Sequence, residues 1–349
     1  MPSLNVASAI CSCGLALASA AFAAPPFPAT DKRPVTDTYH GVAVTEDYRW
    51  LEDDANPEVR HWVAEQNAFT RAYLEAIPER AAIGARVAEL LRTAPVRRYD
   101  FQYRGGKLFA LKIEPPKNQP LLVVLSPSGD VESERVVLDP NTLDPSGHTA
   151  IDFFTPSFDG KRVAVSLSKN GSEEGTAYVY DVASGRRLVE EIPGVNAPTA
   201  GGSVEWAPDG RGFYYTRYPR EGERAPEDRQ FFQQVYFHAL GAPAASDRYV
   251  IGRELPRIAE IQLRGSRDGS QLLAIVRNGD GGEIGYRLRG PDGRWHEVAR
   301  FTDGVKQLDF GGDGMLYGMT IKDAPLGRII AIPVRQPSLA HARTIVPES

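Results

Sequence analysis

The sequence predicts a mainly β protein, a β-propeller of four-stranded blades that follows a short helical N-terminal segment. Two observations predict this fold. Short stretches of alternating apolar and polar residues fill the chain from Val96 onward, and Asp-Gly turns recur among them at intervals of about 45 to 60 residues. An interval of this size accommodates one four-stranded antiparallel sheet with its loops. At about 45 to 50 residues per blade, residues 96–349 provide about five blades.

Four Asp-Gly pairs define the repeats, and an alternating apolar stretch such as Val163, Val165 and Leu167 follows each of them. A blade cannot bury both faces of its sheet until neighbours stack on it, so repeats of this kind favour a propeller. A pair of β-sandwiches is the alternative. The four principal turns are Asp159-Gly160, Asp209-Gly210, Asp268-Gly269 and Asp313-Gly314; further turns, expected to supply the remaining hairpins, are Asn170-Gly171, Ser184-Gly185, Asp280-Gly281 and Asp303-Gly304.

The segment before the repeats predicts two helices. Residues 24–49 are rich in proline and are expected to be irregular. Asn56 before Pro57 is typical of a helix start, and apolar side chains recur at near-helical spacing as far as about Leu74. A second periodic stretch over 83–91 predicts a helix that ends before Pro95. We therefore expect an N-terminal extended and helical segment over 24–95 and a propeller domain over 96–349.

Residues 1–23 predict a cleaved secretion signal. No charged residue lies between Val6 and Ala24, and the stretch closes on an Ala-Phe-Ala pattern suited to signal peptidase. No Lys or Arg precedes the apolar residues, so a disordered tail or a misplaced start codon is the alternative. Cys11 and Cys13 both lie in this stretch, so the processed chain would have no thiol chemistry. We expect a periplasmic or secreted protein without a membrane span.

The composition excludes several classes of protein. Hydrophobic residues make up 42% and charged residues 24% of the chain, which is typical of a globular protein and not of a disordered one. The balance of 40 Lys and Arg against 45 Asp and Glu, with no basic cluster, provides no electrostatic attraction to nucleic acid or an anionic membrane. We therefore expect neither partner.

The sequence contains no complete set of catalytic residues. Acyl transfer by serine needs a G-x-S-x-G turn followed by an acid and a histidine. The nearest stretch, residues 265–269, reads Gly-Ser-Arg-Asp-Gly and predicts an ordinary turn. Glu52-Asp53-Asp54 and Glu173-Glu174 predict solvated carboxylates, and Gly281-Gly282 and Gly311-Gly312 predict turns rather than phosphate loops. Six single histidines lack metal-ligand spacing: His40, His61, His148, His238, His296 and His341. We expect no catalytic residue, metal or cofactor.

Two sets of residues resemble a known family. The most specific set precedes the repeats: Tyr39-His40-Gly41, the residues from Glu46 to Asp53 (Glu-Asp-Tyr-Arg-Trp-Leu-Glu-Asp), Trp62-Val63, Gln66-Asn67 and Thr70. The second set lies in the repeats: residues 179–181, 192–195, 206–215 and 234–238. With these residues, in this order, the chain from about residue 34 to its end resembles the prolyl oligopeptidase family of serine peptidases.

The resemblance implies more than the residues themselves do. Family members have a seven-bladed propeller that caps an α/β-hydrolase domain, and they cut short peptides after proline. The chain ends within what we expect to be the fifth blade, so it predicts an incomplete propeller, about five of seven blades, with the catalytic Ser, Asp and His on sequence that follows. We expect the N-terminal and propeller part of an exported serine endopeptidase, a fragment inactive alone, whose propeller gates access of short proline-containing peptides to the hydrolase domain.

One binding residue follows from the resemblance. Arg277 lies in a stretch similar to the family strand whose arginine contacts the bound peptide, and a guanidinium donor suits peptide carbonyls. An exposed strand-end arginine is the alternative. The aromatic that joins this arginine in some members is absent at 201–203. Two wider alternatives remain, a stand-alone secreted binding module and the related basic-residue-specific oligopeptidases, although residues 50–53 and Gln66-Asn67 favour the prolyl branch.

Overall fold

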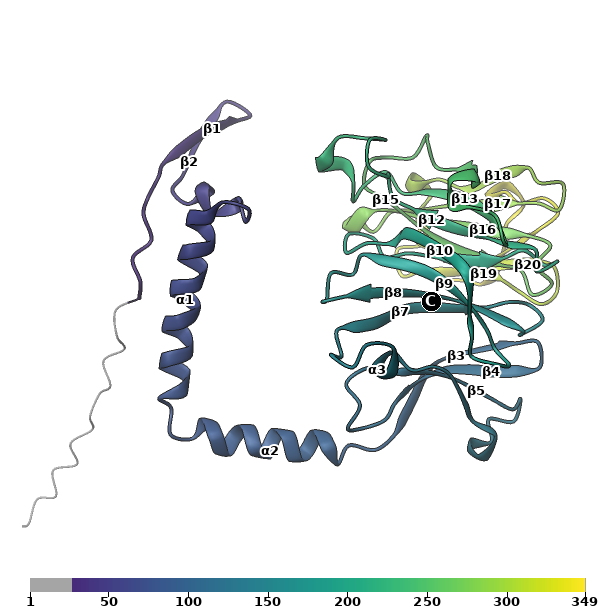
Figure 1. Cartoon of the computed structure of the whole chain (residues 1–349). Helices are drawn as coiled ribbons and strands as arrows, with labels where there is room; N and C mark the ends of the chain where they lie inside the picture. The colour runs from purple at the N-terminus through teal and green to yellow at the C-terminus, as the bar shows by residue number, and fades with distance from the viewer. Residues whose placement is uncertain (1–26, 349) are drawn as a thin grey trace, which may run out of the picture. The chain divides into compact units, whose positions relative to one another are not determined.

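A computed structural model describes residues 27–348, so the predicted signal lies outside the described residues. Contacts divide the chain between Leu90 and Leu91, shortly before the first propeller strand begins. The N-terminal unit holds a two-stranded hairpin and two helices (Figure 1). Its elements are β1 (Val35–Tyr39), β2 (Val42–Glu46), the 3-10 turn Arg49–Glu52, α1 (Pro57–Glu75) and α2 (Arg80–Arg92).

The hairpin corrects the prediction that residues 24–49 are irregular. Strands β1 and β2 pair in register from Val35 with Glu46 to Tyr39 with Val42. The turn between them uses His40 at φ 50° and Gly41 at φ 83°, the left-handed pair that a tight hairpin turn requires. The turn residues that specify this hairpin were therefore present in the sequence, although the prolines before it suggested an irregular segment.

The family-like residues of this unit fasten an extended segment to helix α1. The Trp62 indole donates to Thr30 Oγ1 at 3.0 Å, and Gln66 Nε2 donates to the Pro28 carbonyl at 3.2 Å. Asn56 caps α1 by accepting from the Glu58 amide at 3.0 Å, with Pro57 at the first helical position. The helices therefore begin and end close to their predicted limits.

The second unit contains five four-stranded antiparallel sheets, which we number blades 1 to 5 in chain order (Figure 1). Sheets of this kind, each built from four consecutive strands, confirm the propeller blades and exclude the two-sandwich alternative. Blade 1 is β3 (Arg97–Arg104), β4 (Lys107–Ile113), β5 (Leu121–Leu125) and β6 (Arg135–Leu138); blade 2 is β7 (Thr149–Pro156), β8 (Arg162–Lys169), β9 (Gly175–Asp181) and β10 (Arg187–Asn196). Blade 3 is β11 (Val204–Trp206), β12 (Gly212–Arg217), β13 (Gln234–Ala239) and β14 (Arg248–Ile251); blade 4 is β15 (Ala259–Gly265), β16 (Leu272–Asn278), β17 (Ile284–Arg289) and β18 (Trp295–Ala299). Blade 5 is β19 (Val305–Phe310), β20 (Met315–Thr320), β21 (Arg328–Pro333) and β22 (Arg343–Val346); a short helix α3 (Pro140–Leu143) joins blades 1 and 2.

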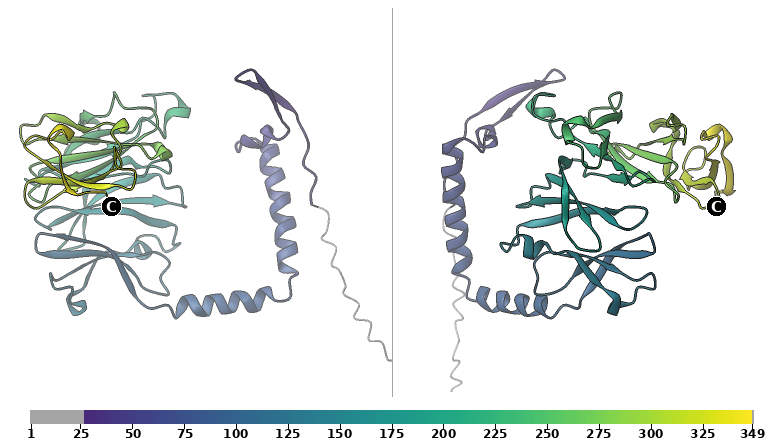
Figure 2. Two further views of the ribbon diagram at one scale, coloured as in Figure 1. Left: turned by 180° about the vertical axis from the view of Figure 1, so that it is seen from behind. Right: turned by 45° about the vertical axis from the view of Figure 1, so that its right-hand side comes forward.

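The strand directions give the propeller unit two distinct faces. The first strands of successive blades approach one another, β3 against β7, β7 against β11 and β11 against β15, so they line the centre of the arc that the blades follow in Figure 2. Because neighbouring strands are antiparallel, the first-to-second-strand turns of all blades share one face, which we call the turn face. The second-to-third-strand loops and the links between blades share the opposite face, the connection face.

The predicted Asp-Gly pairs form the first-to-second-strand turns of blades 2 to 5. Each glycine has a positive φ, from 63° at Gly160 to 76° at Gly314. Each aspartate accepts from the amide two residues later; Asp159 accepts from the Lys161 amide at 3.0 Å, for example. Asp303-Gly304 is the exception among the further turns, because it links β18 to β19 across two blades instead of closing a hairpin.

Apolar clusters between neighbouring blades form the core. Phe109 and Leu122 of blade 1 pack with Val163 of blade 2, and every later pair of blades shares a similar cluster. Each fully buried side chain of this kind stabilises the fold by about 1.5–3 kcal/mol. Trp206 joins blades 2 and 3 by a hydrogen bond as well, since its indole donates to the Thr155 carbonyl at 2.8 Å.

Blade 3 also holds a buried polar network. The Asp247 carboxylate accepts from the Tyr215 hydroxyl at 2.6 Å and from His238 Nδ1 at 2.7 Å. The side chains of His238 and Asp247 are 2% and 3% exposed. Because water does not reach these groups, each donor depends on this carboxylate for its hydrogen bond.

We expect Asp247→Ala to destabilise the chain by about 2–4 kcal/mol, because it leaves two buried donors unpaired. Tyr215→Phe removes only one hydrogen bond and is expected to cost about 1 kcal/mol. Urea unfolding followed by tryptophan fluorescence measures both effects, since Trp206 is buried in the same blade. Equal midpoints for Asp247→Ala and the unaltered chain would contradict this account of the network.

Candidate substrate-facing site

Arg277 lies near the end of β16, on the connection face, with an exposed side chain. It pairs in register with Glu260 of β15 and Ile284 of β17. Burial raises the pKa of the Glu260 carboxyl and the nearby Asp280 raises it further, whereas the positive charge of Arg277 lowers it. The guanidinium is thus held at the end of a rigid central strand, where its donors face solvent.

A cavity of about 390 Å³ adjoins this strand end. Its lining includes the carboxylates Glu260 and Asp280 and the aromatic residues Tyr218 and Phe231. The Tyr218 hydroxyl donates to the Gly201 carbonyl at 2.9 Å, and burial raises its pKa to about 12. The hollow therefore combines aromatic and carboxylate walls beside Arg277.

The structure supplies an aromatic where the sequence lacked one. No side chain fits at Gly202, because a Cβ there would lie 2.0 Å from the Val195 carbonyl oxygen and 3.0 Å from the Phe153 ring. Phe153, on the first strand of blade 2, thus occupies the region left without an aromatic at 201–203. The sequence does not reveal this aromatic because Phe153 and Gly202 belong to neighbouring blades, which only the fold brings together.

The first strands of blades 1 to 4 line a central cavity of about 430 Å³. Phe153, Arg104 and Arg264 contribute to its wall, together with Glu205 of β11, which is 7% exposed. Glu205 Oε2 accepts from the Gly265 amide at 2.9 Å, but Oε1 has no hydrogen-bond partner. Burial raises the pKa of Glu205, against the opposing effects of the Gly265 amide and the two arginines.

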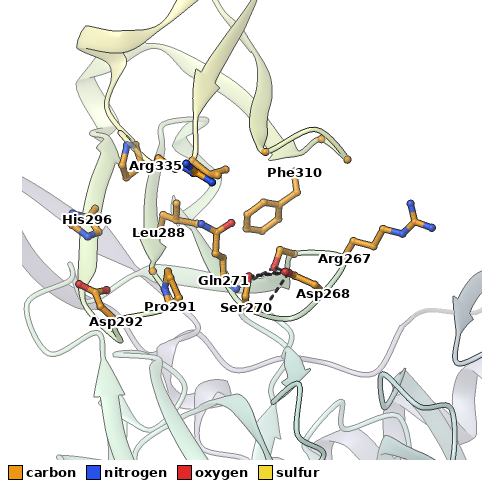
Figure 3. A pocket seen from close by; sticks show the side chains of 17 residues that line it. Arg267, Asp268, Ser270, Gln271, Leu288, Pro291, Asp292, His296, Phe310 and Arg335 are labelled. Atoms are coloured by element: carbon orange, nitrogen blue, oxygen red, sulfur yellow. Dashed lines mark hydrogen bonds between the residues drawn. The ribbon is translucent and has the colours of Figure 1, made fainter.

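A cavity of about 1020 Å³ lies at the turn face between blades 4 and 5 (Figure 3). Leu288 and Phe310 line it, and Figure 3 shows Arg267 pointing away from it. The Ser266 hydroxyl donates to Asp268 Oδ1 at 2.7 Å, as expected for the ordinary turn predicted at 265–269. Both side chains therefore stabilise the turn and do not form part of a catalytic set.

The described residues show no assembled nucleophile. His238 has a carboxylate partner, but the third member of that network is the Tyr215 hydroxyl, and His238 Nε2 has no partner. The two carboxylate clusters predicted to be solvated, at 52–54 and 173–174, are exposed. Over residues 27–348 no group of three metal-binding side chains is present, and no helix there is long and apolar enough to cross a membrane.

Comparison with known proteins identifies the family. The prolyl oligopeptidase N-terminal β-propeller domain matches residues 28–349. The chain belongs to the prolyl oligopeptidase family. It is 28% identical over 333 residues to the prolyl endopeptidase of Elizabethkingia meningoseptica, and 26% identical over 371 residues to prolyl oligopeptidase A of Amanita bisporigera. These alignments cover 93% and 92% of this chain but 45% and 46% of the relatives.

Solved structures of the family agree with the fold. A structure from a study of two prolyl endopeptidases superposes with a TM-score of 0.82 at 31% identity, over 93% of this chain and 47% of that one. Prolyl oligopeptidase B of Galerina marginata, bound to a 25-residue macrocyclization substrate, gives a TM-score of 0.74 at 21% identity, which supports the fold alone. This chain spans about half the length of these relatives, and its described residues contain the propeller blades without an α/β-hydrolase domain.

We expect Glu205→Gln to stabilise the chain at neutral pH. The folded-state pKa of Glu205 is raised, so the unfolded chain loses this proton first, and stability falls as pH rises from the unfolded towards the folded pKa. Glutamine keeps an acceptor for the Gly265 amide without the buried charge. The free energy of unfolding, measured by urea titration between pH 4 and 8, should be higher for the glutamine variant, by a difference that grows with pH to about 1–3 kcal/mol. A stability difference between the two proteins that stays constant with pH, or that favours glutamate, would contradict this account of Glu205.

Proposed function

We propose that this chain is the N-terminal and propeller part of an exported prolyl oligopeptidase-like serine endopeptidase, which cleaves short peptides after proline. The observation that carries the proposal is the match over residues 28–349 together with prolyl endopeptidase relatives that are about twice as long. The propeller gates access to a hydrolase domain that the described residues do not contain. Because an acyl-enzyme needs an activated nucleophile, this part alone does not hydrolyse peptides.

Exposed apolar surfaces support a missing partner domain. Helix α2 exposes Ile83 at 60% and Val87 at 49%, although its periodicity is that of a helix with one packed side. On blade 5, Met319 and Ile329 are 40% and 42% exposed on the side of the sheet away from blade 4. Surfaces of this kind mark interaction sites. We assign the helix surface to the hydrolase domain and the blade 5 surface to a further blade.

Arg277 is the residue that we propose contacts the peptide. Its exposed guanidinium can donate to peptide carbonyls, and the adjoining cavity with Tyr218 and Phe231 provides apolar walls for a short peptide. A secreted binding module would use the same face, so an assay of hydrolysis must accompany any assay of binding.

We expect the purified chain to release no chromophore from a Gly-Pro chromogenic peptide above a heat-denatured control. The same chain extended into any downstream reading frame that encodes G-x-S-x-G should hydrolyse that peptide. Initial rates at equal protein concentration test both statements. Turnover by the chain alone would refute the missing-domain proposal, whereas a stop codon followed by unrelated sequence would favour the binding module.

Arg277→Gln should weaken binding of a short proline-containing peptide about tenfold, close to 1.4 kcal/mol, because it removes a charged donor. Isothermal titration calorimetry measures the dissociation constant. Arg294→Gln is the matched control, since its side chain is 83% exposed at the turn face. Equal affinities for the two variants would remove Arg277 from the site.

A further inference from the structure

A second hollow on the connection face is rich in arginine. This cavity of about 570 Å³ lies between the long loop that joins β12 to β13, residues 218–233, and the link after β14. Three of its nine lining residues are arginines and only one is acidic. The lining residues are Arg217, Tyr218, Pro219, Glu223, Arg224, Phe232, Gln234, Tyr236 and Arg253.

Aromatic rings orient all three guanidinium groups. Arg217 lies 4.1 Å from the centre of the Tyr236 ring, and Arg224 lies 3.6 Å from that of Phe232. Arg253 lies 4.0 Å from the centre of the Tyr249 ring. A guanidinium stacked on a ring keeps its N–H donors in its own plane, free for a planar acceptor. Stacking on the rings therefore orders these side chains, although Arg224 and Arg253 stay exposed.

The positive charge of the cavity is only partly balanced. Glu223 occupies two donors of Arg217, at 2.7 and 3.2 Å, so the structure already shows a carboxylate seated at this edge. Arg217 is 5% exposed, and its Nε is buried without a hydrogen-bond partner. Within the described residues, Arg224 and Arg253 have no acidic side chain at ion-pair distance. Arg224 and Arg253 are exposed, so their guanidinium groups are open to an acceptor in the cavity, whereas the Nε of Arg217 is enclosed.

Backbone strain occurs at the same place. Phe232 has φ 53°, in the left-handed region that bulky residues rarely adopt. The Phe232 amide donates to the Arg257 carbonyl at 2.8 Å, which holds this conformation and keeps the ring beneath Arg224. Strain of this kind costs of order 1–3 kcal/mol and concentrates at ligand-binding sites. This conformation fixes the ring on which Arg224 stacks.

We propose that this cavity binds an oxyanion, a carboxylate or phosphate group, through Arg224 and Arg253. Bidentate donation from guanidinium groups is the strongest recognition that side chains offer to such groups. The ligand sits beside Glu223 on the open part of the cavity. This site is separate from Arg277 and does not depend on the proposed peptidase function.

Isothermal titration calorimetry of the full chain with sodium phosphate, at constant ionic strength set with sodium chloride, tests the proposal. We expect saturable binding, weakened at least tenfold in the double variant Arg224→Gln/Arg253→Gln. The control is Arg211→Gln/Arg294→Gln, which removes the same charge from exposed positions at the turn face, 88% and 83% exposed. Circular dichroism and thermal unfolding check that both variants fold. Absence of phosphate binding, or equal affinities for the two double variants, would overturn the site.

A second variant and a second ligand sharpen the result. Glu223→Gln removes the one negative charge of the lining and should tighten phosphate binding; weaker or unchanged binding would contradict the arrangement. A short N-acetylated peptide with a free α-carboxylate, compared with its C-terminal amide, distinguishes the sources of the oxyanion. Tighter binding of the acid, lost in Arg224→Gln/Arg253→Gln, assigns the site to a peptide carboxylate, and binding of phosphate alone assigns it to a free anion.

Discussion

Apolar packing between neighbouring sheets is the interaction on which the propeller unit depends. A four-stranded blade presents two faces, and burying only one leaves too little core for independent stability. The four clusters between successive blades solve this problem, and each contains side chains with almost no exposure, such as Phe109, Phe213 and Leu316. The loops of the connection face are therefore attached to strands that cannot move without disrupting the packing between blades.

This constraint explains why binding features gather in loops. The strands of blades 2 to 4 are fixed by packing on both sides, but the second-to-third-strand connections can vary in length without disturbing a core. In blade 4 this connection runs only from Gly279 to Glu283, whereas in blade 3 it runs from Tyr218 to Gln233. The longer connection separates the cavity beside Arg277 from the arginine-rich cavity, and Tyr218 contributes to both. One loop thus shapes two chemically different hollows.

Local patterns predicted the repeats because their physical causes are local. An Asp-Gly turn needs only a short side chain that accepts from a nearby amide and a residue that tolerates positive φ. Asp268 and Gly269 supply both, so the turn can be predicted from these two residues alone. The helix that begins at Pro57 was predictable for the same reason, because Asn56 and Pro57 mark its start locally. The position of Phe153 beside Gly202 and the network around Asp247 could not be predicted in this way. Each depends on how separate strands are arranged in space, which no local pattern indicates.

The two ends of the row of blades differ in a way that bears on how the ring is completed. On the side of blade 1 away from blade 2, Lys112 is nearly buried and pairs with Glu134 at 2.8 Å, and Arg98 pairs with the same carboxylate at 2.5 Å. The same side of blade 1 also exposes Val136, and blade 5 exposes Met319 and Ile329. Charged groups paired on a protein surface tolerate solvent, whereas exposed apolar groups gain by burial. Packing of a further blade would therefore bury apolar surface at either end, but at the blade 1 end it would also cover this ion-pair network, whose desolvation opposes the apolar gain.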